Sequence, residues 1–183
     1  VRGNSDDPKS FPIVRDVIVI PTVDWEMLPG GIMHLELHSF NENAAFAFVE
    51  PAIEALTKNA RGMIIDLRNN PGGFLEIAIH LAGWFVDKGE VVVREEFRTE
   101  PPHEFRANGN EALRHMPVVV IMNGGSASAS EILAGALRDI RSVPIVGEKS
   151  FGKGTVQELR NLKDGSKLKI TVAHWLTPNG TVI

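Results

Sequence analysis

The chain has 183 residues, of which 43% are hydrophobic and 23% charged, and its formal net charge is -4. This length accommodates one domain with a sizeable core, and no segment is apolar for long enough to span a membrane. The acidic balance gives no broad attraction to nucleic acid. Because the chain contains no cysteine, it has no disulfide, thiol nucleophile or thiolate metal site, and redox chemistry leaves the compartment open.

Hydrophobic patterns in the first half of the chain predict strands and helices that alternate with polar turns. The predicted elements are strands over 17–23, 32–40 and 62–67, and helices over 43–59 and 74–86. Pro51 lies inside the first helical segment and predicts an interruption there, because proline removes a helix hydrogen bond.

The second half repeats the order strand, small-residue loop, helix. The predicted elements are strands over 117–122, 143–146, 155–160 and 167–175, and a helix over 130–140. The polar residues 101–110 are predicted to form an exposed crossing loop. This alternation of strands and helices predicts an α/β fold whose sheet contains crossovers.

The loop GGSASASE over 124–131 leads into the predicted helix 130–140. A helix N-terminus presents unpaired backbone N–H groups and partial positive charge. Ser128 can therefore attack a carbonyl there while the amide of Ala129 stabilises the oxyanion. The small residues around Ser128 keep the approach open to a polymeric substrate.

Other interpretations of this loop remain open. Ser128 and Glu131 also fit the S-x-x-E capping box, in which the serine only caps the helix. Ser126 and Ser130 have weaker claims as nucleophiles, because residues two apart at a helix start point to different sides. At most one of the three serines is a nucleophile.

A second loop, FGKGTVQ over 151–157, places Lys153 between two glycines, 25 residues after Ser128. A lysine is a general base only when neutral, which requires desolvation or nearby positive charge. The phenylalanine and the glycines of this loop suit a buried amine, and Gln157 can orient it. The alternative is a solvated surface lysine in a turn. The pair of loops favours a serine-lysine hydrolase.

A third loop, DLRNNPGG over 66–73, joins a predicted strand to a predicted helix. Gly73 is the residue where the backbone can approach a substrate carbonyl most closely, so its amide is a second oxyanion candidate.

Elsewhere, His34, Glu36 and His38 alternate on one strand face and form a known zinc ligand set. Apolar residues alternate with them, so a solvated polar face is favoured and no metal is predicted.

The motifs DLRNNPGG, GGSASASEILAGALRD, GEKSFGKGTVQ and KITVAHWLTPNG, in this order, resemble those of the C-terminal processing peptidases, also called tail-specific proteases. The resemblance runs from about Phe11 to the end of the chain. It implies that Ser128 is the nucleophile, Lys153 the base and Gln157 its positioning partner, with oxyanion amides from Gly73 and Ala129. It also implies a crotonase-like and Clp-protease-like spiral of ββα units with a mixed sheet, and no cofactor.

The resemblance further implies how the chain is organised and what it acts on. Residues 1–16 would be a linker or the remnant of the exit from a PDZ domain, and residues 17–183 a peptidase core that is incomplete at both ends. The substrate would be an unstructured polypeptide with a free C-terminus, cleaved near that end through an acyl-enzyme. The location would be extracytoplasmic, in a periplasm, cell envelope or lumen. An adaptor or a homo-oligomeric partner is left open.

Two alternatives come from other functional classes on the same fold. One is a noncatalytic binding module similar to the retinoid-binding repeats, which has no need of a lysine beside the serine. The other is a hydratase of acyl-CoA type, which would want catalytic carboxylates beside the oxyanion loops. Ser128, Lys153 and Gln157 together argue against both.

Overall fold

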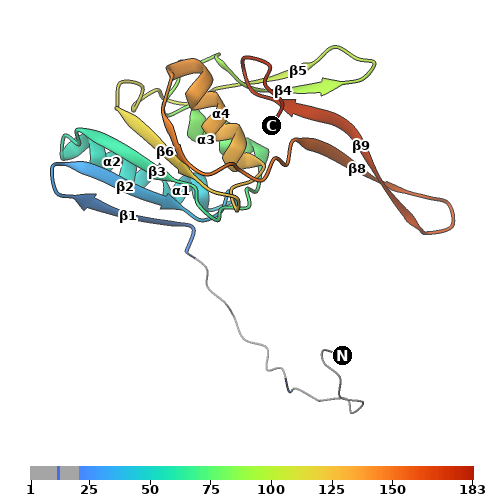
Figure 1. Cartoon of the computed structure of the whole chain (residues 1–183), viewed down its shortest axis with the longest axis horizontal. Coiled ribbons are helices and arrows are strands. Elements are labelled where there is room, and N and C mark those ends of the chain that lie inside the picture. Colours follow the sequence, from blue (N-terminus) through green and yellow to red (C-terminus); the bar gives the residue numbers. More distant parts are fainter. Residues whose placement is uncertain (1–11, 13–20) are drawn as a thin grey trace.

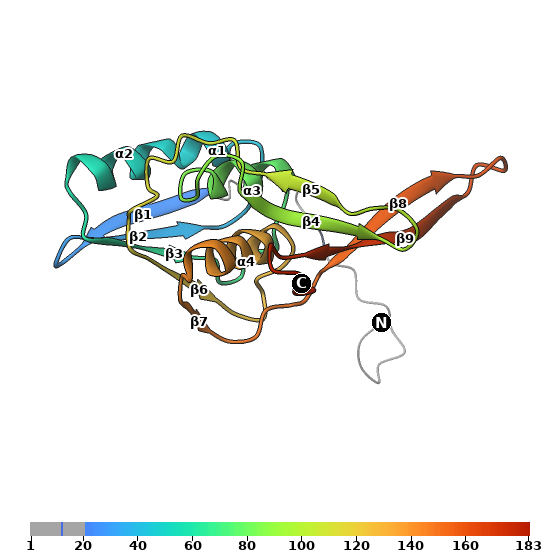
Figure 2. The ribbon, with the colours of Figure 1, turned by 90° about the horizontal axis from the view of Figure 1, so that it is seen from above.

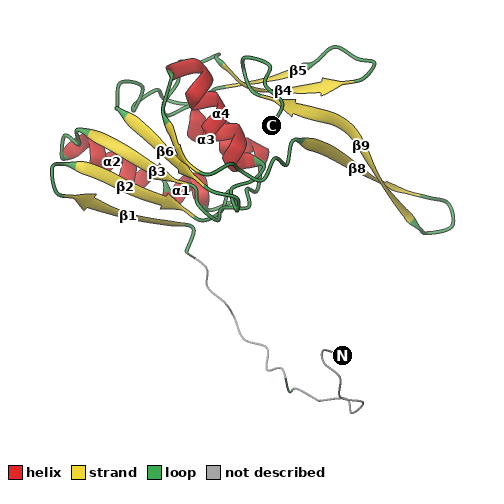
Figure 3. Ribbon diagram, in the orientation of Figure 1, coloured by secondary structure: helices red, strands yellow, loops and turns green. Residues whose placement is uncertain are grey.

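The computed structural model describes residue 12 and residues 21–183, whose strands form two sheets (Figure 1). Helices α3 (Leu75–Ala82) and α4 (Ala129–Arg141) lie between the two groups of strands (Figure 3). The predicted domain boundary at residue 16 and the first four residues of the predicted strand 17–23 lie outside the described residues.

The first sheet is mixed and has the strand order β1-β2-β3-β6-β7. β1 pairs antiparallel with β2, and the other three pairs are parallel. Parallel neighbours need crossover connections, and helices supply them here. The strands are β1 (Val23–Leu28), β2 (Ile32–Leu37), β3 (Gly62–Asp66), β6 (Val118–Met122) and β7 (Ile145–Gly147).

The second sheet is antiparallel throughout and has the order β5-β4-β9-β8. Its strands are β4 (Val91–Phe97), β5 (His103–Arg106), β8 (Thr155–Asn161) and β9 (Lys167–Leu176). The β8–β9 hairpin projects from the body of the molecule in both views (Figures 1 and 2). The α/β prediction with a mixed sheet is confirmed.

The predicted helix 43–59 is divided into α1 (Ala44–Ala47) and α2 (Val49–Thr57). The break falls at Phe48, three residues before the Pro51 interruption that the sequence predicts. Pro51 has no N–H to donate to the carbonyl of Ala47 four residues earlier, so the first helix ends there. Pro51 itself lies in the first turn of α2, where the N–H would have no helical partner.

The core forms where the helices meet the first sheet and each other. Every second residue of β2 is buried, with Met33, Leu35 and Leu37 at most 1% exposed, as the alternation in the sequence predicts. Phe48 packs edge-on against Trp84 and Phe85, with ring centroids 5.5 and 5.9 Å apart. Because α4 also contacts α3 and β4, its N-terminus is fixed beside the carboxyl ends of β3 and β6.

One predicted loop is wrong. Residues 101–110 include β5, which pairs antiparallel with β4. The pairing is made at the exposed edge of the second sheet, where polar side chains face water and leave no hydrophobic alternation to detect. Within the described residues, no helix is long and apolar enough to cross a membrane.

Candidate active site

Ser128 lies at the sharp turn between β6 and α4. Its backbone has φ 56° and ψ -114°, a conformation that costs about 1–3 kcal/mol in a residue with a side chain and is found mainly at functional sites. The Ser128 N–H donates a 2.8 Å hydrogen bond to Oε2 of Glu131, which is the Glu131 half of the predicted capping box. The turn places Ser128 at the positive end of the helix.

The three serines of this loop have different surroundings. Ser126 is fully buried, and its Oγ donates to the carbonyl of Leu67 at 2.7 Å. Ser130 is also fully buried, and its Oγ donates to the carbonyl of Asn70 at 3.0 Å. Ser128 is partly exposed. The hydroxyls of Ser126 and Ser130 therefore join the serine loop to the loop after β3, and neither faces solvent.

The loop after β3 packs directly against the serine loop. The side chain of Asn70 is buried: its Nδ2 donates to the Leu37 carbonyl at 2.6 Å, and its Oδ1 accepts the Gly72 N–H at 2.9 Å. The Ala127 N–H donates to the Asn70 carbonyl at 3.0 Å. Gly72 has φ 94°, and a Cβ there would lie 2.9 Å from the amide nitrogen of Ala129. Only a glycine permits this approach.

The two predicted oxyanion amides belong to residues at or next to this contact, because Gly73 follows Gly72 and Gly72 approaches Ala129. Among the described residues, neither the Gly73 N–H nor the Ala129 N–H has a hydrogen-bond partner. Ala129 is the first residue of α4, so no earlier turn of the helix can accept its N–H. Gly73 has φ 151°, and a Cβ there would lie 2.3 Å from the carbonyl oxygen of Phe40. The packing therefore requires glycine at both 72 and 73.

The lysine loop runs between β7 and β8 and is tied to the serine loop through its backbone. The Phe151 N–H donates to the Ser126 carbonyl at 2.9 Å. The Gly152 and Lys153 N–H groups donate to Oε1 and Oε2 of Glu131 at 2.7 and 3.0 Å. The spacing predicts that these loops meet, and their backbones do so.

The side chains predicted to act together are less closely joined. Lys153 and Gln157 are both exposed, although the sequence predicts a setting suited to a buried amine. The loop is open on one side of Lys153, where a Cβ at Gly152 would meet nothing within 4 Å. Among the described residues, no hydrogen bond joins the side chains of Ser128, Lys153 and Gln157.

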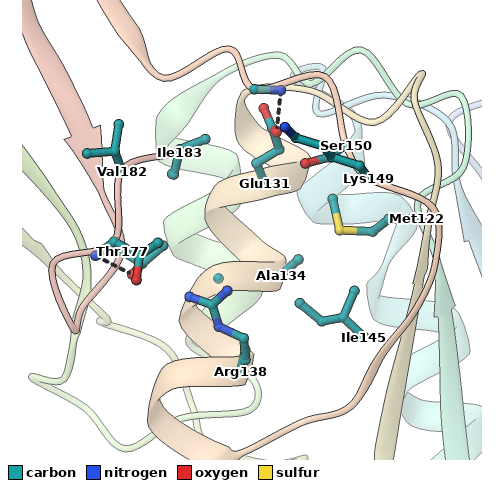
Figure 4. Close-up of a pocket in the computed structure, with 13 residues that line it drawn as sticks. Met122, Glu131, Ala134, Arg138, Ile145, Lys149, Ser150, Thr177, Val182 and Ile183 are labelled. Carbon is teal, nitrogen blue, oxygen red and sulfur yellow. Dashed lines mark hydrogen bonds between the residues drawn. The ribbon is translucent and has the colours of Figure 1, made fainter.

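A cavity of about 210 Å³ lies beside the serine and lysine loops, on the α4 side (Figure 4). Glu131 extends from α4 towards the segment Lys149–Gly152 at one end of the cavity, and Arg138 lines the wall one and a half to two turns further along α4. Ser128 and Lys153 do not line it. The cavity is therefore separate from Ser128, the predicted nucleophile.

The carboxyl end of β3 carries a buried charge. Asp66 is fully buried and bonded to the side chain of Arg68, with Nη2 2.5 Å from Oδ2, and to Nε2 of His34 at 3.3 Å. Burial would raise the pKa of Asp66, but hydrogen bonds from the Arg68 side chain and backbone and from His34 hold that pKa below its ordinary value. The charged pair caps the end of the strand, just before the 66–73 loop.

The histidines considered as metal ligands pair with carboxylates instead. His38 Nε2 lies 2.8 Å from Oδ2 of Asp24, and His34 bonds Asp66. Among the described residues, no group of three or more histidine and acidic side chains is placed to hold a metal ion.

Sequence reasoning missed the part that Glu131 plays. The S-x-x-E pattern indicates only a helix cap, whereas the carboxylate also accepts two amides from a loop more than 20 residues away. Asn70 was missed as well, because an asparagine before Pro-Gly-Gly is typical of a turn. A polar residue in the loop that follows a buried strand is the one signal that could have indicated it.

Comparisons with known proteins identify the family. The model of peptidase family S41 matches residues 31–183. The carboxy-terminal processing protease CtpA of Bacillus subtilis is 42% identical over 97% of this chain and 37% of its own length. A carboxy-terminal-processing protease of Bartonella bacilliformis is 39% identical over 100% of this chain and 43% of its own.

Among solved structures, the photosystem II D1 C-terminal processing protease is similar with a TM-score of 0.83 and 33% identity, over 92% of this chain and 47% of that one. The chain thus spans less than half the length of the relatives it matches. The family match over residues 31–183 includes all three loops, and together with the relatives it confirms the resemblance to the C-terminal processing peptidases. The chain belongs to peptidase family S41.

Proposed function

We propose that this chain carries the catalytic core of a serine endopeptidase that cleaves polypeptides near their C-termini. The observation that supports this most strongly is the environment of Ser128. It is the partly exposed serine of the three, it occupies a strained turn at a helix N-terminus, and the unpaired amides of Gly73 and Ala129 lie beside it. A nucleophile and two oxyanion donors are the minimum set for acyl transfer.

In the proposed mechanism, Lys153 in its neutral form removes the proton from Ser128 Oγ while Oγ bonds to the carbonyl carbon of the substrate. The carbonyl π electrons move to oxygen, and the oxyanion accepts hydrogen bonds from Gly73 and Ala129. When the tetrahedral intermediate collapses, the C–N bond breaks and the leaving amine takes the proton from Lys153. The product is an acyl-enzyme ester on Ser128.

Water then completes the cycle. Lys153 removes a proton from a water molecule as the water oxygen attacks the ester carbonyl carbon. The proton then passes to Ser128 Oγ as the bond between Oγ and the acyl carbon breaks. Gln157, four residues after Lys153 at the start of β8, would orient the amine. Because Lys153 is exposed in the structure, we propose that a bound polypeptide covers it and disfavours its charged form.

The substrate we propose is an unstructured polypeptide with a free C-terminus, and the location we propose is extracytoplasmic. Both come from the family to which the chain belongs. The relatives named as carboxy-terminal processing proteases are consistent with this substrate class.

The test is hydrolysis of an unstructured peptide, together with covalent labelling by a serine-directed fluorophosphonate. Ser128→Ala should abolish both while lowering stability by about 1 kcal/mol, the typical cost of a lost helix cap. Lys153→Arg keeps the charge but cannot deprotonate near neutral pH, so hydrolysis should fall at least about 100-fold.

The matched control is Lys149→Arg, an exposed lysine four residues earlier in the same loop, which should leave hydrolysis within about 2-fold. Normal turnover by Ser128→Ala would refute the proposed nucleophile. Equal turnover by Lys153→Arg and Lys149→Arg would refute the proposed base, and would leave a binding module or a histidine-dependent enzyme to be considered.

A further inference from the structure

Glu131 holds together the two loops that carry the proposed nucleophile and base. It lies in the first turn of α4 and is 7% exposed. Its Oε2 accepts the N–H groups of Ser128 at 2.8 Å and Lys153 at 3.0 Å, and its Oε1 accepts the Gly152 N–H at 2.7 Å. Figure 4 shows the carboxylate directed from the helix towards the lysine loop.

The chemistry of these contacts requires the ionised side chain. A buried carboxylate is costly unless its oxygens are hydrogen-bonded, and here both oxygens of Glu131 accept backbone amides. The helix N-terminus adds favourable partial positive charge. Only the carboxylate is a pure acceptor; a glutamine would turn an NH₂ group towards one of the donors.

A simple helix cap does not explain this arrangement. In a capping box the glutamate accepts one bond, from the N–H of the cap residue, and Ser128 supplies that bond. The two further bonds go to consecutive residues of a loop that follows β7. Because Oε2 is shared by Ser128 and Lys153, one atom fixes the distance between the two backbones.

We propose that Glu131 is a positioning residue that sets the register between Ser128 and Lys153. This inference rests on the function proposed above. The Lys153 side chain extends freely from the loop, so its reach to Ser128 Oγ depends on where its backbone is anchored. A displacement of about 1 Å in a catalytic group can cost roughly 100-fold in rate. Loss of the anchor should therefore lower kcat and leave KM nearly unchanged.

Glu111 provides a matched control in the same chain. It too accepts a remote backbone amide, the Lys88 N–H at 2.8 Å, and its other carboxylate oxygen pairs with Arg114 at 3.4 Å. Its contact lies between segments that carry none of the proposed catalytic groups. Glu111→Gln should therefore disturb one loop contact without touching the register of Ser128 and Lys153.

The experiment compares Glu131→Gln and Glu111→Gln in the 183-residue chain by steady-state peptide hydrolysis and by amide hydrogen exchange. For Glu131→Gln we expect kcat to fall at least about 10-fold with KM within about 3-fold. We expect exchange at Gly152 and Lys153 to accelerate at least about 10-fold, with the second half of α4 unchanged. Glu111→Gln should show neither effect.

Two results would overturn the proposal: unchanged exchange at Gly152 and Lys153, or faster exchange with an unchanged kcat. If Glu131→Gln does not fold, Glu131→Asp takes its place under the same criteria, since it keeps the charge but is one methylene too short to reach both loops. If the parent chain shows no hydrolysis that depends on Ser128, the proposed function fails separately. The exchange result alone then decides whether Glu131 joins the loops.

Discussion

Replacing Asn70 by alanine should destabilise the fold through two buried groups that lose their partners. The Asn70 side chain is fully buried, donates to the Leu37 carbonyl at 2.6 Å and accepts the Gly72 N–H at 2.9 Å. A buried polar group left without a partner costs about 1–3 kcal/mol. The two groups together place the expected loss near 2–6 kcal/mol, a large part of the 5–15 kcal/mol typical of a domain.

The loss can be measured by urea unfolding with linear extrapolation to water. Asn110→Ala is the control, because Asn110 is exposed and accepts only the neighbouring Ala112 N–H at 3.1 Å. We expect that control to change stability by about 0.5 kcal/mol or less. A loss of less than about 1 kcal/mol for Asn70→Ala would refute the reasoning, because it would mean that water or backbone movement satisfies both groups.

The contact between the loops and the charge at the end of β3 give two further expectations. Gly72→Ala should reduce hydrolysis at least about 100-fold, because its Cβ would lie 2.6 Å from the Ala127 carbonyl oxygen. The control is Gly30→Ala, which should retain activity because Gly30 has a similar φ of 87° and a Cβ there would meet nothing within 4 Å. Asp66→Asn should lower the melting temperature near pH 7. The pKa of Asp66 is depressed in the fold below 3.8. The ionised Asp66 therefore stabilises the fold above about pH 3.8, and this stabilisation is lost as the pH falls through the lower folded pKa. The difference in melting temperature between the variant and the parent should disappear at that low pH. A difference that persists at the lowest pH would contradict this assignment.

Much of the first sheet could be predicted because local patterns and packing agree there. The strand predicted at 117–122 and the helix at 130–140 correspond to β6 and α4, since an apolar run, a small-residue loop and an apolar helix face each point to the same structure. β1 and β5 were harder. The predicted strand 17–23 overlaps β1 (Val23–Leu28) only at Val23, although VDWEML alternates apolar with polar residues. His103–Arg106 is short and mostly polar, and pairing with β4 decides its conformation.

The candidate site, like the fold, could be predicted only in part. The spacing of the sequence predicts which loops meet, because each follows a strand whose end lies at the same edge of the sheet. It does not predict which polar groups hold the loops together. The hydrogen bonds of Glu131 with Gly152 and Lys153 depend on the path that the lysine loop takes between β7 and β8. The exposure of the Lys153 side chain depends on the same path.

The open edges of the two sheets bear on how the chain avoids associating with others like it. Unpaired strand edges are templates for pairing with another chain, and charged side chains or very short strands prevent it. β8 is an edge strand of the projecting hairpin, and Glu158 and Arg160 form an ion pair on it at 3.1 Å, on either side of the exposed Leu159. β7, at an edge of the first sheet, has only three residues. Charge protects the β8 edge and shortness the β7 edge, so the projecting β8–β9 hairpin need not act as a seed for aggregation.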